Sequence, residues 1–265
     1  MSQRLLEANQ RSVAAAAHVN ERVRLLQDRA VLLARLGRVA EAERTLSDAE
    51  QLMPEDAPRV LKLRFAYVRA IDNYFSKRFA DARLKMYAVL REARKPSEPT
   101  LIAECESALA LFMQREGDVR SAVAHARSVL ANANATLEAR YRASLALASL
   151  HQDAHDHETA YRLYRETHDV VKDLDDEIAM ASWLQRAALA KAAHARQSAG
   201  RGELDKSGVK QAIADLQQCI EYAAKVPDGP TTTLDHLLLA EMYVLQKRYK
   251  QALALYDLYL PQCEG

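Results

Sequence analysis

Glycine and proline are scarce in this sequence, with 7 of each among 265 residues. Both residues break regular structure, so their scarcity predicts long, uninterrupted helices. Most of the prolines lie where the repeat pattern described below has its gaps: Pro54, Pro58, Pro96, Pro99, Pro227 and Pro230. The composition therefore indicates an all-helical chain with short connections.

Cysteines and long apolar segments are also few. The 3 cysteines, Cys105, Cys219 and Cys263, lie far apart without the spacing of a metal site, which suits packing roles in a reducing compartment. No segment approaches the roughly 20 apolar residues that span a bilayer, and Ala14 to Ala17 is too short for a signal-peptide core. We expect a cytoplasmic protein without a membrane partner.

Charge of one sign is not in excess, because 37 Lys and Arg residues face 36 Asp and Glu residues. A net charge of +1 attracts neither nucleic acid nor a membrane surface, so no nucleic-acid partner is predicted. The sequence also has no nucleophile elbow, zinc-protease motif, dinucleotide loop or kinase motifs. We predict that the protein is not an enzyme and has no cofactor.

What the sequence does contain is alanine in two repeating series, mostly 38 to 40 residues apart. The first series consists of Ala30, Ala70, Ala110, Ala148 and Ala240. The second consists of Ala42, Ala82, Ala122, Ala160, Ala212 and Ala252. Two antiparallel helices that cross closely need small residues at the crossing, so the series predict an array of helical hairpins.

The stretch from Arg29 to Pro54 shows the family that these hairpins resemble. Gly37, Ala42, Leu46, Ala49 and Pro54 fall at the offsets of the tetratricopeptide repeat (TPR). The period near 40 exceeds the usual 34 of that family, as in its longer-helix members, many of which are signalling and regulatory proteins. The resemblance implies an all-α, right-handed superhelical solenoid of about six antiparallel hairpins.

The predicted organisation is a single domain, 1–265. Its repeats are expected near 18–54, 58–96, 99–133, 136–173, 176–226 and 230–263, with a long inner loop at 198–208 in the fifth. Residues 2 to about 18 are expected to form a capping helix or the end of an earlier repeat. The last helix carries many apolar residues, which suggests either a fragment of a longer protein or a dimer surface.

The resemblance also implies a peptide-binding concave groove lined by the first helix of each repeat. The candidates at those offsets are Arg24, Gln27, Asp28, Arg35, Arg64, Tyr67, Ile71, Tyr74, Glu104, Gln114, Arg115, Arg142 and Gln152. Tyrosine offers rigid contact area, and arginine can pair bidentately with carboxylates. The alternative is ordinary structure, because arginine commonly covers solvated helix faces and tyrosine commonly packs in cores.

His151, His155 and His157 are the weak candidates for a metal site. They lie within seven residues and have Asp153, Asp156 and Glu158 between or beside them. The repeat register places His155 and His157 in an exposed turn with nothing to exclude water, so we expect a solvated polar turn and no bound metal.

The predicted function is a scaffold that binds a protein or peptide segment. It is expected to be the sensory or regulatory part of a larger bacterial signalling protein, such as a diguanylate cyclase or a transcriptional regulator. Two alternatives stay open. One is a self-assembling structural module that forms a homodimer through its terminal helices. The other is a sensor of a small ligand or metal built on the histidine turn or the 198–208 loop.

Overall fold

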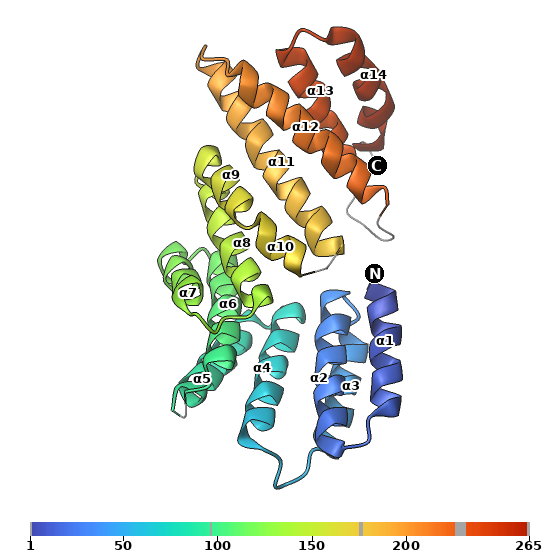
Figure 1. Cartoon of the computed structure of the whole chain (residues 1–265), viewed down its shortest axis with the longest axis vertical. Coiled ribbons are helices and arrows are strands. Elements are labelled where there is room, and N and C mark those ends of the chain that lie inside the picture. Colours follow the sequence, from blue (N-terminus) through green and yellow to red (C-terminus); the bar gives the residue numbers. More distant parts are fainter. Residues whose placement is uncertain (1, 96, 175–176, 226–231, 264–265) are drawn as a thin grey trace. The chain divides into compact units, whose positions relative to one another are not determined.

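The computed structural model describes residues 2–95, 97–174, 177–225 and 232–263, and the regular structure in these ranges is helical throughout, with no strand (Figure 1). The chain divides into two compact units, Met1–Ala143 and Ser144–Gly265, which are described separately. The boundary falls inside one helix, and the prediction of a single domain stays a prediction. None of the described helices is long and apolar enough to cross a membrane.

Unit 1 contains three complete helical hairpins preceded by one helix. Its helices are α1 (Ser2–Ala15), α2 (Val19–Arg35), α3 (Val39–Leu52), α4 (Arg59–Phe75), α5 (Phe79–Arg94), α6 (Pro99–Glu116) and α7 (Val119–Ala131), followed by the first residues of α8 (Leu137–Asp153). The hairpins are α2/α3, α4/α5 and α6/α7. Helix α1 packs on α2, where Leu6 joins Leu33, Ala34 and Ala42 in one apolar cluster.

Unit 2 contains the rest of α8 and the remaining hairpins. Its other helices are α9 (His157–Glu166), α10 (His168–Asp173), α11 (Glu177–Gly200), α12 (Lys206–Ala223), α13 (Thr233–Leu245) and α14 (Tyr249–Tyr259), and the short 3-10 helix η1 (Leu260–Cys263) follows. With the pairs α8/α9, α11/α12 and α13/α14, the described residues form six hairpins, in agreement with the prediction of about six. Helix α10 was not predicted. Pro96, Pro227 and Pro230 lie outside the described residues.

The two alanine series occupy the helix crossings, as predicted. All eleven alanines are buried, with at most 2% of their surface exposed. The large residues that follow the second series, such as Leu46, Met86 and Leu216, are fully buried beside them. Methyl side chains at these places let the helices of a hairpin approach closely.

The predicted turns share one backbone conformation. In five of the hairpins the middle residue has a positive φ: Gly37 (74°), Lys77 (62°), Gly117 (81°), His155 (60°) and Lys247 (59°). The N–H of the next residue then bonds back to a carbonyl near the end of the first helix, as Arg38 does to Leu33 at 2.9 Å. This left-handed C-cap ends each first helix at the same place in its repeat.

The fifth repeat differs from the prediction of a long loop at 198–208. Helix α11 continues to Gly200 and α12 starts at Lys206, so only residues 201–205 connect them. The surplus residues of this repeat lengthen its helices instead. The alanine-rich run before Gly200 has nothing to break it, and α11 ends with the same turn as its neighbours, at Gly202 (φ 77°).

Candidate functional site

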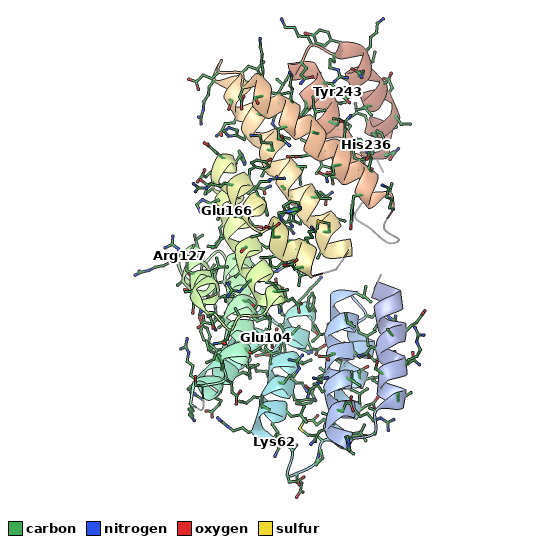
Figure 2. The ribbon with its side chains drawn as sticks, in the orientation of Figure 1. Lys62, Glu104, Arg127, Glu166, His236 and Tyr243 are labelled. Atoms are coloured by element: carbon green, nitrogen blue, oxygen red, sulfur yellow. The ribbon has the colours of Figure 1, made fainter. Side chains whose placement is uncertain are left out.

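Three predicted groove residues form a chain of ion pairs across the first helices of successive repeats. Arg64 on α4 lies between Asp28 on α2 and Glu104 on α6. Its guanidinium nitrogens are 2.7 Å from Asp28 Oδ1 and 3.5 Å from Glu104 Oε2. Glu104 is labelled on unit 1 in Figure 2. We call the surface formed by Asp28, Arg64, Glu104 and Arg142 the A-helix face.

Arg142 on α8 extends this arrangement to the fourth repeat. It donates a hydrogen bond of 3.1 Å to Tyr67 Oη and lies 3.7 Å from Glu138 Oε1. Tyr67 itself is only 5% exposed. The prediction that Tyr67 offers contact area to a ligand is therefore corrected: its ring packs in the core, and its hydroxyl holds Arg142 in place.

The charges on the A-helix face are partly buried. Burial raises the pKa of Glu104, while the positive charges of Arg64 and Arg142 oppose that rise. Burial disfavours the charged form of Arg64, but the hydrogen bond to Asp28 and the charge of Glu104 raise its pKa overall, so it stays cationic. Its buried Nε has no hydrogen-bond partner among the described residues. This donor is buried beneath the face.

Two further candidates lie in the core. Gln27 is fully buried and donates to the Leu61 carbonyl at 3.4 Å, and Ile71 is 6% exposed. Both side chains are buried and cannot contact a ligand. The prediction that they line the groove is therefore corrected. Arg24 is exposed on α2, and the side chain of Arg35 lies outside the described residues.

Tyr74, Gln114 and Arg115 gather at the C-terminal ends of α4 and α6. The Tyr74 ring stacks on Phe112 with centroids 4.4 Å apart. The Arg115 guanidinium lies 4.8 Å from the centroid of the Phe79 ring and 6.0 Å from that of Tyr74. Tyr74 and Gln114 are half-buried and Arg115 is exposed, so this cluster is accessible from solvent.

Gln152 belongs to unit 2, beside the histidine turn. It accepts a hydrogen bond from Tyr164 Oη at 3.3 Å and lines a cavity of about 650 Å³ together with His155 and His157. Burial lowers the pKa of His157, and the neighbouring His155 lowers it further. His151 pairs with Asp156 at 3.0 Å. In the described ranges no three His, Cys, Asp or Glu side chains are grouped as a metal site.

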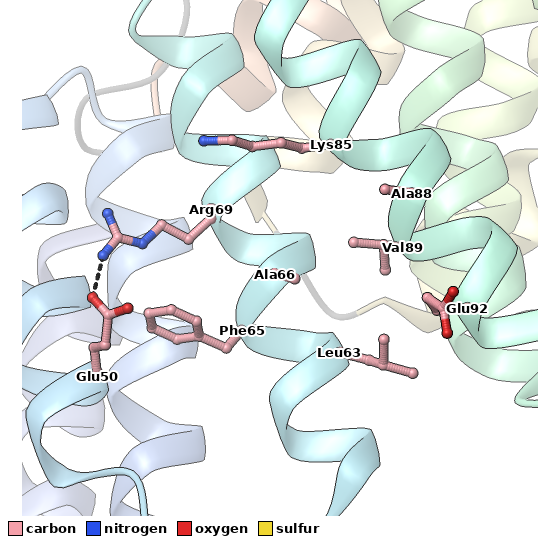
Figure 3. A pocket seen from close by; sticks show the side chains of 9 residues that line it. All are labelled: Glu50, Leu63, Phe65, Ala66, Arg69, Lys85, Ala88, Val89 and Glu92. Atoms are coloured by element: carbon pink, nitrogen blue, oxygen red, sulfur yellow. Dashed lines mark hydrogen bonds and ion pairs between the residues drawn. The ribbon is translucent and has the colours of Figure 1, made fainter.

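Sequence reasoning missed a pocket of about 470 Å³ between α3, α4 and α5 (Figure 3). Its apolar lining consists of Leu63, Phe65, Ala66, Ala88 and Val89, and its charged residues are Glu50, Arg69, Lys85 and Glu92. Arg69 pairs with Glu50 at 2.5 Å and lies 5.3 Å from the centroid of the Phe65 ring. The sequence did contain a signal of this pocket, namely the apolar residues Leu63, Phe65 and Ala66 on α4, which lie outside the alanine series.

Solved structures share this fold, although no protein-family model and no curated protein matches the sequence. The apo form of RapI matches with a TM-score of 0.61 and 13% identity, over 90% of this chain and 63% of that chain. A Rap protein complexed with competence and sporulation factor matches with a TM-score of 0.59 and 13% identity, over 98% of this chain and 70% of that chain.

The chain therefore spans less than two thirds of the RapI chain. At 13% identity the likeness concerns the fold alone. It agrees with the features built up from the residues, namely the buried alanine series, the repeated left-handed turn and the six hairpins. The chain has the fold of the TPR-like helical-repeat proteins.

Proposed function

We propose that the protein is a regulatory scaffold that binds a peptide or protein segment along the A-helix face. The observation that carries the proposal is that the first helices of four successive repeats bring charges of alternating sign together, from Asp28 through Arg64 and Glu104 to Arg142. A segment lying across these helices would meet charges of alternating sign at each repeat.

The ion pairs on this face are suited to exchange with a ligand. The side chains of Arg64 and Asp28 keep 33% and 38% of their surface exposed. Half-exposed ion pairs contribute only about 0–1 kcal/mol, so replacing Asp28 by a ligand carboxylate costs little. A guanidinium can hold a carboxylate through two parallel hydrogen bonds, so the exposed part of the Arg64 side chain is suited to a ligand carboxylate.

The shared fold supports this proposal, because a Rap protein of the same fold was solved with competence and sporulation factor bound. The proposal includes no catalytic step, no cofactor and no nucleic-acid partner. Its narrower form makes the array the sensory or regulatory part of a larger signalling protein, such as a diguanylate cyclase or a transcriptional regulator. The reading frame of the gene tests that form, which requires a catalytic or DNA-binding domain in the same protein.

Arg64 and Arg69 give a matched pair of variants for the main test. Both lie on α4 and both pair with an acid of the preceding repeat, but Arg64 belongs to the A-helix face and Arg69 to the pocket of Figure 3. Peptides would first be selected from a displayed library on the immobilised full chain. Their affinity would then be measured by fluorescence anisotropy for the wild type, Arg64→Gln and Arg69→Gln.

We expect Arg64→Gln to weaken the selected peptides by about tenfold or more, as the loss of a charge-assisted hydrogen bond implies. Arg69→Gln should leave the affinity unchanged. Weakening by Arg69→Gln alone would move the binding surface to the pocket of Figure 3 and overturn the proposal. Equal melting temperatures for the two variants would show that the comparison reports binding.

Self-assembly is kept as a second candidate function because of one observation on α14. Leu253 and Leu258 there are 60% and 58% exposed. A second copy could cover these side chains. Light scattering of the wild type and of Leu253→Glu/Leu258→Glu tests the idea: a dimer mass that only the variant loses would support it, and a monomer mass for both at high concentration would exclude it.

A further inference from the structure

Unit 2 contains a cavity of about 620 Å³ between α9, α11 and the segment that leads into α12. Helix α9 contributes Tyr161, Arg162 and Arg165 to its lining, and α11 contributes Lys191 and His194. Its volume falls within the range of roughly 300–1,000 Å³ that is typical of small-molecule sites.

Two of the three cations of this cavity lack an ion pair, whereas Arg162 Nε lies 3.9 Å from Glu166 Oε1. In unit 1, Arg59, Arg64 and Arg69 each form an ion pair of 3.1 Å or shorter with an acid of another helix. In the described part of the chain, by contrast, neither Arg165 nor Lys191 has an ion pair. Positive charges that converge on one cavity repel each other unless an anion lies between them.

Two carboxylates, Asp205 and Glu158, also line the cavity. The backbone N–H of Gly208, together with the positive charge of Lys191, holds the pKa of Asp205 below its usual value. Glu158 is an exposed residue in the first turn of α9. The lining therefore has three positive charges, one of which is paired with Glu166, and two carboxylates, in addition to the His194 imidazole.

Tyr161 supplies a fixed aromatic wall. Its hydroxyl donates to Asp215 Oδ2 at 3.1 Å, and Gln211 donates to the other oxygen of the same carboxylate at 2.7 Å. The Lys191 ammonium lies 4.9 Å from the centroid of the Tyr161 ring. The hydrogen bond to Asp215 therefore fixes the Tyr161 ring, and Lys191 lies beside it. This arrangement is in place before a ligand binds.

We propose that this cavity binds a small phosphate ester. Arg165 pairs with two phosphate oxygens, Lys191 supplies a second positive charge, and the organic part of the ester contacts the Tyr161 ring. The cavity is much larger than an inorganic phosphate ion, which is why the ligand is an ester. This site does not depend on peptide binding at the A-helix face, and either proposal can fail without the other.

Calorimetric titration of the full chain with phenyl phosphate at constant ionic strength tests the site. Arg165→Gln/Lys191→Gln removes the two cations that have no acid partner. The control variant, Arg127→Gln/Lys250→Gln, removes two exposed cations from α7 and α14; Arg127 is labelled in Figure 2. We expect saturable binding to the wild type and the control, and at least tenfold weaker binding to Arg165→Gln/Lys191→Gln.

Tyr161→Leu tests the aromatic wall separately. It should weaken phenyl phosphate but leave the weaker binding of inorganic phosphate unchanged. The proposal would be overturned if the wild type showed no saturable binding of phenyl phosphate. It would also be overturned if the wild type, the control variant and Arg165→Gln/Lys191→Gln bound phenyl phosphate with equal affinity. Equal wild-type affinities for phenyl phosphate and inorganic phosphate would overturn the assignment of the ligand as an ester.

Discussion

At the scale of single residues, Glu106 on α6 ties two repeats together. Its side chain is 4% exposed and accepts hydrogen bonds from His125 Nδ1 at 2.5 Å and Arg94 at 2.6 Å. An ionised carboxylate can only accept, so the proton lies on Nδ1 of His125. The hydroxyl of Tyr87 lies 3.0 Å from the other ring nitrogen. Side chains of α5, α6 and α7 therefore meet at one buried charge.

Glu106→Gln tests the contribution of this charge. Burial disfavours the charged form, but the hydrogen bonds from His125 and Arg94 outweigh it and lower the pKa of Glu106. A carboxyl group whose pKa is lowered in the folded state stabilises the fold at pH values above its usual pKa of 4.5. This stabilisation is lost as the pH falls through the folded-state pKa. We expect the variant to lose about 1–3 kcal/mol of unfolding free energy at pH 7.

Urea unfolding between neutral and acidic pH checks this prediction. The difference between wild type and variant should shrink as the pH falls below 4.5. Glu41→Gln is the control, because Glu41 pairs with Arg38 on the surface and both are well exposed. A loss for Glu41→Gln as large as that for Glu106→Gln would show that burial of the charge is irrelevant.

At the scale of helices, the hairpins share the same kind of crossing and the same turn conformation. Five of the described crossings have a buried alanine from both series, the α11/α12 crossing has Ala212 alone, and five turns have one residue in the left-handed conformation. Gly37 and Gly117 adopt that conformation without steric cost, whereas Lys77, His155 and Lys247 adopt it although they carry a side chain. Packing of the two helices imposes the turn geometry there, although an L-residue in this conformation costs about 1–2 kcal/mol.

Ala122→Leu tests a crossing directly. Ala122 on α7 is fully buried, and the added methylenes have no room without displacing α6 or α7. We expect a loss of about 1–3 kcal/mol in unfolding free energy, measured by chemical denaturation. Ala124→Leu on the exposed side of the same helix should change stability little. Equal stability of the two variants would mean that Ala122 does not mark a close crossing.

At the scale of the whole molecule, a repeat array transmits damage chiefly to adjacent repeats. Ala212 lies fully buried on α12, in the apolar core that joins α11, α12 and α13. We expect Ala212→Leu to increase amide hydrogen exchange in those helices and to leave α2 to α5 unchanged. Exchange that rises equally in both units would instead indicate that the chain unfolds as one cooperative unit, as expected if residues 1–265 form a single domain.

Periodicity made the fold predictable from the sequence. Because alanine recurs at the helix crossings of successive hairpins, this one sequence is enough to predict about six hairpins and their buried small residues. The length of the loop predicted at 198–208 was overestimated because that prediction also rested on the period. A period shows that a repeat has surplus residues, but helix propensity and capping decide whether these residues extend a loop or the helices, as they do here in α11 and α12.

The candidate site was only partly predictable. The repeat offsets correctly place Asp28, Arg64, Glu104 and Arg142 on first helices, but they include the buried Gln27, Tyr67 and Ile71 as well. A repeat offset specifies position along a helix and only roughly the direction in which a side chain points. Neighbouring helices then decide which side chains are covered.

The sequence by itself determined the helical hairpins, their number and their crossings, because these depend on local spacing within each repeat. The tertiary structure alone decided which charges meet. The pairing of Arg64 with Asp28 and Glu104, the contacts of the buried Glu106 and the position of Lys191 beside the Tyr161 ring all join residues of different helices. Electrostatic energy varies with distance and burial, and neither quantity can be read from the order of residues in a chain.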